Sequence, residues 1–255
     1  MGYFDKVPVS DIAQLCVDVY DDPSDNILRT FKFNDLWVRV KTWTDKELEY
    51  MKDQDFKACL YTNKHYNSVI LAIRGTVLKK GNILEDIDFS LDKDSKIFKS
   101  ITLFFKLLNT TEKSWINAEN KYVCGHSLGG ILAKYSANIH KSTTVTFNSP
   151  GVLEYLKLRG QPTQIMSGKR VVTYYAYKDV IGNFHRTKDL GEHIPVILSA
   201  NPKVIPDKVT ESAGDLAIYE YGLDHDEKHL PIYYHSMVKM YEEISSNTDY
   251  MLDRY

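Results

Sequence analysis

The chain contains 255 residues, of which 43% are hydrophobic and 26% are charged. This composition is typical of a globular protein, and it excludes a disordered, collagen-like or low-complexity chain. The formal net charge is −2, and no basic run is longer than a pair such as Lys79-Lys80. A chain without a basic arm or stripe is not expected to bind nucleic acid.

The cysteines and the first residues of the chain predict a cytoplasmic protein. Cys16, Cys59 and Cys124 each stand among apolar neighbours without a short repeat spacing, which indicates buried free thiols in a reducing compartment. Residues 1–10 contain no apolar core and no cleavage-like site, so no signal peptide is expected. The apolar runs are also far shorter than a membrane span.

The hydrophobic pattern changes its period several times along the chain. In chain order it predicts a helix over 11–18 capped by Ser10, strands over 37–40, 58–62 and 68–74, a helix over 97–108, a strand over 122–124, a helix over 128–140, a strand over 143–147, a short helix over 152–158, a strand over 171–177 and a last helix over 237–244. Strands that alternate with helices predict an α/β fold, with a mostly parallel sheet and helices on both faces. No repeat or linker marks a boundary, so we expect a single domain over residues 1–255.

The predicted helix over 97–108 is strongly amphipathic, with apolar residues at positions 97, 98, 101, 104, 105 and 108. Such a stripe suits either a membrane surface or a protein core. Because the predicted sheet needs helices to cover it, we predict that this stripe is part of the core.

A Gly-His-Ser-Leu-Gly motif at 125–129 stands between a predicted strand and a predicted helix. A serine on this sharp turn points its hydroxyl outward, as in a nucleophile elbow. Side chains at Gly125 and Gly129 would clash where the strand and helix cross. The amide of Leu128, at the helix N-terminus, faces any negative charge that develops on an attacked carbonyl oxygen. The motif therefore predicts Ser127 as a nucleophile, whereas His126 is expected to pack or line the site.

The residues around this motif resemble those of the class 3 (fungal-type) lipases of the α/β-hydrolase superfamily. The resemblance rests on Gly-His-Ser-Leu-Gly-Gly at 125–130, on Ile-Arg-Gly-Thr at 73–76, and on Phe-Asn-Ser-Pro-Gly at 147–151. It covers about residues 57–179 and fits the tail of the chain more loosely. A smaller branch of intracellular, lid-poor hydrolases of the same superfamily is the alternative relative. The family implies an α/β-hydrolase fold, and the hydroxyl residue of its Arg-Gly-Ser/Thr turn completes the oxyanion hole. The resemblance assigns that role to Thr76.

A serine nucleophile in this fold needs a histidine base and an orienting carboxylate, in the chain order serine, acid, histidine. Asp179 follows the predicted strand over 171–177, where the carboxyl end of the sheet would present it. The pair Asp179-Val180 also matches the type of acid segment found in the family. An aspartate that caps a turn before Gly182 is the alternative. We predict Asp179 as the acid of the triad.

Five histidines follow this acid: His185, His193, His225, His229 and His235. His185 and His193 come too soon after the acid for a further strand to intervene, and His225 and His229 share an Asp-rich segment. His235 precedes the last predicted helix, where this fold places its histidine. We predict His235 as the base, with His229 and then His193 as the reserves, because a triad is defined by geometry and not by position.

These features together predict a serine hydrolase that cleaves carboxylic esters of lipids, as a lipase or a phospholipase A-type enzyme, through an acyl-enzyme. The alternatives are a small-ester esterase or thioesterase, and a hydrolase-fold binding module without turnover. No phosphate loop, dinucleotide fingerprint or zinc-type cysteine pattern occurs, so no cofactor or metal is expected. The expected partners are a lipid or other ester substrate and, transiently, a membrane surface; the sequence does not indicate an oligomeric state.

Overall fold

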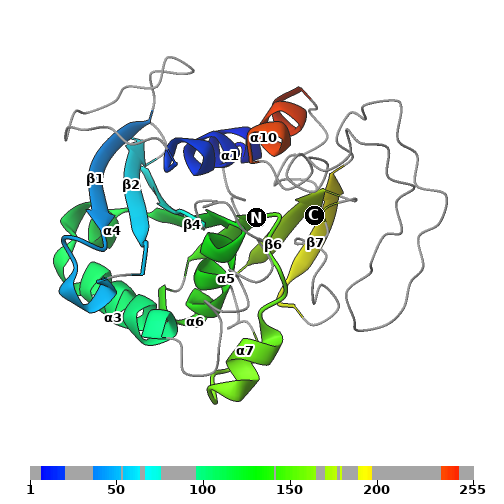
Figure 1. Cartoon of the computed structure of the whole chain (residues 1–255). Coiled ribbons are helices and arrows are strands. Elements are labelled where there is room, and N and C mark those ends of the chain that lie inside the picture. Colours follow the sequence, from blue (N-terminus) through cyan, green and yellow to red (C-terminus); the bar gives the residue numbers. More distant parts are fainter. Residues whose placement is uncertain are drawn as a thin grey trace, which may run out of the picture.

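The computed structural model describes residues 7–20, 37–52, 54–63, 67–75, 96–140, 142–164, 170–176, 179, 189–196 and 237–246. These residues form one mixed sheet with helices on both of its faces (Figure 1). The α/β fold predicted from the sequence is therefore confirmed.

The sheet of the described residues has seven strands: β1 (Val38–Thr44), β2 (Lys57–Asn63), β3 (Ser68–Ile73), β4 (Asn120–His126), β5 (Thr143–Phe147), β6 (Val171–Ala176) and β7 (Glu192–Val196). Their order in the sheet is the order along the chain. The first three strands pair antiparallel, and β3 through β7 pair parallel. All residues of β3 and of β6 are buried, as expected for strands covered on both faces.

Seven helices accompany the sheet in the described part of the chain: α1 (Val9–Asp18), α3 (Lys96–Thr111), α4 (Lys113–Asn117), α5 (Leu128–Tyr135), α6 (Ala137–His140), α7 (Leu153–Leu158) and α10 (Met237–Ser246), together with the short 3₁₀ helix η1 (Glu49–Met51). Crossovers between neighbouring parallel strands are right-handed. Each parallel strand from β3 to β6 is followed by the next strand on the same side of it. Right-handed connections that all advance in the same direction place their helices on the same face, so α3 through α7 lie on one face of the sheet. Figure 1 shows α1 and α10 side by side on the opposite face.

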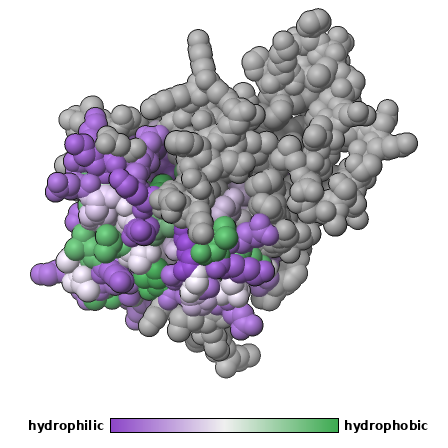
Figure 2. Space-filling view, turned by 60° about the horizontal axis from the view of Figure 1, so that its bottom comes forward, coloured by the Kyte–Doolittle hydropathy of each residue, from purple (hydrophilic) through white to green (hydrophobic). Residues whose placement is uncertain are grey.

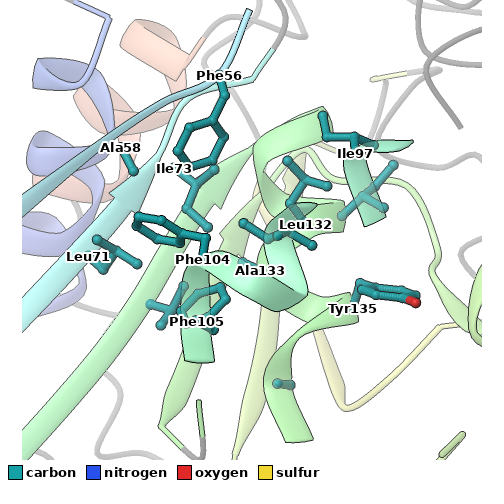
Figure 3. Close-up of a cluster of buried hydrophobic side chains, with 14 of the residues drawn as sticks. Phe56, Ala58, Leu71, Ile73, Ile97, Phe104, Phe105, Leu132, Ala133 and Tyr135 are labelled. Atoms are coloured by element: carbon teal, nitrogen blue, oxygen red, sulfur yellow. The ribbon is translucent and has the colours of Figure 1, made fainter. Parts of the chain in front are cut away.

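Two hydrophobic cores result, one on each face of the sheet, and alternate residues of a strand contribute to opposite cores. On β3, Leu71 and Ile73 face the helices α3 and α5, whereas Ile70 and Ala72 face α1. Figure 3 shows the larger core, in which Phe104 contacts Phe56 edge-to-face at 5.2 Å between ring centroids. The six apolar residues predicted as a core stripe on the helix over 97–108 are all buried, which confirms that prediction.

Several boundaries differ from the sequence prediction. The first helix begins at Val9 with Pro8 as its N-cap, so Ser10 lies inside the first turn and is not the cap. The helix predicted over 128–140 is broken into α5 and α6 at Ser136, whose hydroxyl donates to the Leu132 carbonyl at 2.7 Å. Such back-bonding by serine competes with the helix ladder and bends it.

Three elements were not predicted from the sequence: α4, β7 and the short 3₁₀ helix η1. The edge strand β7 is five residues long and contains Pro195, and a proline within a short run argues against a strand at the sequence level. β7 includes His193, so this histidine stands on a strand of the sheet itself. No helix among the described residues is long and apolar enough to cross a membrane.

Candidate active site

Ser127 connects β4 to α5 in a backbone conformation that side-chain-bearing residues rarely adopt. Its φ is 55° and its ψ is −126°, and a residue held there stores about 1–3 kcal/mol of strain. The turn is fixed by a hydrogen bond from the Ser127 amide to the Phe147 carbonyl at 3.1 Å. The Ser127 side chain does not cap the helix that it precedes, unlike a typical N-cap serine. The first amides of α5 therefore do not engage the Ser127 hydroxyl.

Glycines around Ser127 let β3, β4 and α5 approach one another more closely than side chains would permit. A Cβ atom at Gly125 would overlap the backbone of Gly129, and one at Gly129 would overlap the Ile73 carbonyl of β3. A Cβ atom at Gly130 would lie 2.5 Å from the Cβ of Ser149. The spacing noted in the sequence thus corresponds to direct backbone packing at the turn, as an elbow requires.

The amide of Leu128 is the first N–H of α5, immediately after Ser127. The first N–H groups of a helix have no carbonyl partner within it, and the helix dipole adds partial positive charge there. This end of α5 lies at the carboxyl edge of the parallel strands, where β4 ends at His126. The geometry suits a donor to an oxyanion that develops beside Ser127.

Tyr20, just after α1, joins the end of β3 to the residue before the serine. The Gly75 amide donates to the Tyr20 hydroxyl at 3.0 Å, and that hydroxyl lies 2.9 Å from Nδ1 of His126. The Tyr20 hydroxyl therefore bridges the Gly75 amide and the His126 ring. Burial raises the pKa of Tyr20 above its usual value, so the phenol stays protonated. His126 thus packs beside the elbow, as predicted.

Asp179 is buried just beyond the end of β6, and its amide donates to the Ala176 carbonyl at 2.9 Å. The neighbouring strand β5 supports this turn through Asn148, a residue that the sequence analysis did not single out. Asn148 has a φ of 45°, and its Oδ1 accepts from the Ala176 amide at 2.7 Å. An asparagine directly after a strand is the sequence signal for such a residue, since it tolerates positive φ and can bond to nearby backbone.

The structure thus places Ser127, the Leu128 amide and Asp179 at the carboxyl ends of strands β4 and β6 of one sheet. Thr76 follows the described Gly75 directly but, with the predicted base His235 and the reserve His229, lies outside the described residues. Within the described part of the chain, no group of three or more His, Cys, Asp or Glu side chains is arranged to hold a metal ion.

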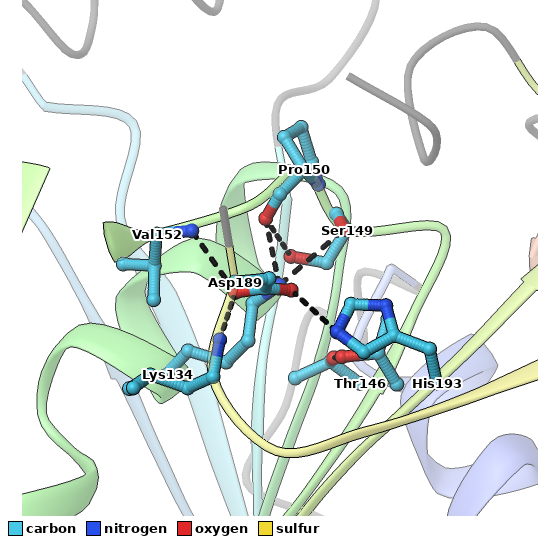
Figure 4. A network of polar contacts seen from close by, with 9 residues as sticks. Lys134, Thr146, Ser149, Pro150, Val152, Asp189 and His193 are labelled. Atoms are coloured by element: carbon cyan, nitrogen blue, oxygen red, sulfur yellow. Dashed lines mark hydrogen bonds and ion pairs between the residues drawn. The ribbon is translucent and has the colours of Figure 1, made fainter. Parts of the chain in front are cut away.

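The second half of α5 carries a buried ion pair that the sequence analysis also missed. Lys134 pairs with Asp189, and both side chains are fully buried. The Lys134 ammonium also donates to the Pro150 carbonyl at 2.6 Å, and Asp189 Oδ1 accepts from the Val152 amide at 3.0 Å (Figure 4). Burial lowers the pKa of Lys134, and the carboxylate of Asp189 opposes that effect. The only sequence signal was a lysine within an apolar helix.

The reserve histidine His193 lies at the edge of this ion pair. Its Nε2 is 3.6 Å from Oδ2 of Asp189, and Figure 4 shows the imidazole pointing toward that carboxylate. On β7, His193 is in register with Thr173 of β6, whereas Asp179 lies beyond the end of β6. His193 therefore lies beside the carboxylate of Asp189, and its strand position is level with the middle of β6 and not with the turn that carries Asp179.

A serine elbow between a buried parallel strand and a helix, at the carboxyl edge of a mostly parallel sheet, defines the α/β-hydrolase class. The chain also matches the phospholipase-like family of Tle-like phospholipase domains over residues 11–217. It belongs to this family, and it is a carboxylic ester hydrolase of the lipase and phospholipase type that acts on lipid esters. The matched region contains Ser127 and Asp179 and ends before His229 and His235.

The fold is also similar to solved fungal lipases at low sequence identity. Lip2 lipase from Yarrowia lipolytica is 18% identical, with a TM-score of 0.46 over 74% of this chain and 79% of that chain. A triacylglycerol lipase from Penicillium expansum is 16% identical, with a TM-score of 0.42 over 72% and 76% of the two chains. Rhizomucor miehei lipase in complex with its propeptide is 14% identical, with a TM-score of 0.39 over 72% and 66%. No curated protein sequence matches the chain.

Proposed function

We propose that the protein hydrolyses phospholipid or acylglycerol esters through a Ser127–His235–Asp179 triad and an acyl-enzyme. The observation that carries the proposal is the strained backbone of Ser127 at the start of α5. Backbone strain persists only where the surrounding structure enforces it, and it concentrates at functional sites. A serine that merely began a helix would adopt an extended conformation and cap it.

In the proposed reaction, the Ser127 oxygen attacks the ester carbonyl while His235 takes its proton. The Leu128 amide and Thr76 donate hydrogen bonds to the oxyanion that forms. The protonated His235 then gives its proton to the departing alcohol, which leaves Ser127 acylated. Water activated by the same histidine releases the fatty acid and restores the serine.

Asp179 orients the histidine and stabilises its cation during both proton transfers. Asp179 is held by the turn at the end of β6, where its amide donates to the Ala176 carbonyl. The Ala176 amide in turn donates to Asn148, the residue after β5. The single domain over residues 1–255 supplies every group in this scheme, and no step needs a metal or cofactor.

The first test is the reaction of the full chain with a fluorophosphonate probe, which labels only an activated serine. We expect the wild type to be labelled, Ser127→Ala to lose the label, and Ser136→Ala to keep it. Ser136 is the matched control because its hydroxyl already donates to the Leu132 carbonyl. An unlabelled wild type would contradict the proposal and favour a binding module.

His235→Ala is expected to lose the label as well, because the probe reacts through the same base. Labelling that survives this change would move the base to His229 or His193, and the same assay on His229→Ala and His193→Ala then decides between them. Release of fatty acid from phospholipid, compared with turnover of short p-nitrophenyl esters, separates a phospholipase from a small-ester esterase.

A further inference from the structure

The helices on one face of the sheet expose large apolar side chains that the core does not require. Among the described residues, four of the five exposed large hydrophobic side chains lie on α3, α4 and α7: Leu103 (49% exposed), Leu107 (42%), Ile116 (39%) and Leu158 (58%). Leu103 and Leu107 are four residues apart on α3, away from its buried stripe. Figure 2 shows hydrophobic patches among hydrophilic residues on this side of the molecule.

The exposed charges of the same three helices all have one sign. They are lysines in every case: Lys96, Lys99, Lys106, Lys113 and Lys157. Helix α3 contains no acidic residue, and the only acidic residue within α4 or α7, Glu154, is half-buried. Glu112, between α3 and α4, is paired with Lys41 at 3.0 Å. Glu119, two residues after α4, is exposed and acidic, but the five lysines outnumber it. A chain with a net charge of −2 therefore carries a locally basic surface on these helices.

Helices α3 and α7 contact each other through the buried ring of Phe98. The Arg159 guanidinium, just after α7, lies over the ring of Phe98 of α3 at 4.0 Å, and that ring also stacks on Tyr155 of α7 at 6.0 Å between centroids. On α3, Lys99, Leu103, Lys106 and Leu107 are three or four residues apart, so lysines and leucines interleave along one exposed strip of that helix. We call the exposed lysines and large apolar side chains of the three helices the α3–α7 face and define it as Lys96, Lys99, Leu103, Lys106, Leu107, Lys113, Ile116, Lys157 and Leu158.

We propose that the α3–α7 face docks the enzyme on an anionic phospholipid surface. Interleaved lysine and leucine side chains suit such a surface, because lysines attract anionic headgroups while leucines enter the headgroup–acyl boundary. The charge of the face is complementary to that of anionic lipid, and a lipid surface presents the substrate of the proposed function, on which this inference rests. The proposed docking residues of α3 lie on a different side of the helix from its apolar stripe, which is buried in the core.

The position of α3 connects this face to the candidate active site. Helix α3 returns the chain from the carboxyl end of β3 to the start of β4, so it runs against the direction of both strands. Its first residues, with Lys96 and Lys99, therefore lie toward the edge of the sheet that carries Ser127. Docking through the face holds that edge beside the lipid that the enzyme hydrolyses.

The test is flotation of the full chain with vesicles rich in phosphatidylglycerol and with pure phosphatidylcholine vesicles. The Ser127→Ala background prevents hydrolysis of the vesicles during the measurement. We expect binding to the anionic vesicles only, weakened by salt. Lys99→Gln/Lys106→Gln is expected to bind about thirtyfold more weakly, since each lysine near an anionic surface contributes about 1 kcal/mol.

The matched control is Lys46→Gln/Lys52→Gln, which removes two exposed lysines outside the three helices and is expected to bind like the parent. Leu103→Ser/Leu107→Ser is expected to bind about tenfold more weakly with an unchanged salt dependence, because it removes apolar contact and not charge. Equal binding by parent and face variants, or no binding to anionic vesicles, would overturn the proposal.

Two further measurements distinguish docking on lipid from a damaged active site and from self-association. Fluorophosphonate labelling of the face variants with Ser127 intact is expected to match the wild type, so loss of binding with normal labelling identifies a docking defect. If the wild type is not labelled but still floats with anionic vesicles, the proposed function fails and the docking surface stands. If the leucine variant loses only self-association in size-exclusion chromatography, the face is a contact between copies of the chain and the proposal is wrong.

Discussion

Helix α5 begins at a strained serine and ends beside a buried ion pair, and the two ends are held against the sheet by different interactions. At the amino end, Gly125 and Gly129 allow direct backbone contact, and no charge is involved. At the carboxyl end, Lys134 and Asp189 are buried together with backbone donors and acceptors around them. The first end sets the chemistry, while the second fixes the helix that supports it.

This difference implies that the two ends respond differently to mutation. Backbone contact tolerates no added atom, so a small change at the elbow should affect the probe reaction as much as stability. A buried ion pair is costly when one partner is lost, because the other charge stays buried without compensation. Changes at the ion pair should therefore affect stability first and leave the elbow reactive while the protein is folded.

The largest stability effect is expected for Lys134→Met, which leaves the Asp189 carboxylate buried without its partner. We expect a loss of about 3–5 kcal/mol in the free energy of unfolding, measured by urea denaturation. Lys134→Met/Asp189→Asn removes both charges and keeps an acceptor for the Val152 amide, so it should recover a large part of the loss. A single variant as stable as the wild type would show that the pair does not anchor α5.

Gly129→Ala is expected to cost about 3 kcal/mol and to abolish labelling by the fluorophosphonate probe. Its added methyl group overlaps the Ile73 carbonyl, and neither backbone can yield without moving α5 away from β3. Gly160→Ala is the control: nothing lies within 4 Å of the added Cβ, and φ is 60°, so it should cost about 1 kcal/mol with normal labelling. Retained labelling in Gly129→Ala would contradict the close packing at the elbow.

Ser127→Gly compared with Ser127→Ala measures the strain at the elbow directly. Both variants lack the hydroxyl, but only glycine adopts a φ of 55° without a Cβ penalty. We expect the glycine variant to be more stable than the alanine variant by about 1–2 kcal/mol, after its larger unfolded-state entropy is included. Equal unfolding midpoints for the two variants would mean that the serine backbone is unstrained.

The elbow was predictable because its signals are local. The serine, its flanking glycines, the buried strand before it and the helix after it stand within a dozen residues, and each has its own sequence pattern. The strand over 68–74 was equally clear, because a continuous apolar run indicates a strand buried on both faces.

The contacts that hold the site together were not predictable from such patterns. Lys134 and Asp189 are 55 residues apart, and Tyr20 is 106 residues from His126. A lysine in an apolar helix indicates that a partner exists, but the partner is selected by the fold and not by nearby sequence. The short strand β7 was missed because Pro195 weakens the only local signal that it has.

The smallest effect is expected at Asn148, which connects the end of β5 to the turn that carries Asp179. Asn148→Gly keeps the positive φ but loses the hydrogen bond to the Ala176 amide, so it should cost about 1 kcal/mol. Asn148→Ala loses the bond and also strains the backbone, so it should be less stable than Asn148→Gly. Asn148→Asp keeps an acceptor and tolerates the same φ, but it places a carboxylate at a fully buried position, so it should be no more stable than Asn148→Gly.

The same three variants distinguish a positioning role from a purely structural one. If Asn148 positions the acid, Asn148→Gly should lower kcat for a p-nitrophenyl ester several-fold with little change in KM. The reason is that a displaced Asp179 stabilises the histidine cation less well, and this cation develops only as the transition state forms. Asn148→Asp should restore kcat in part through the retained acceptor. A stability loss in Asn148→Gly with an unchanged kcat would instead assign Asn148 to the fold alone, and the turn at Asp179 would then be set by its own bond to Ala176.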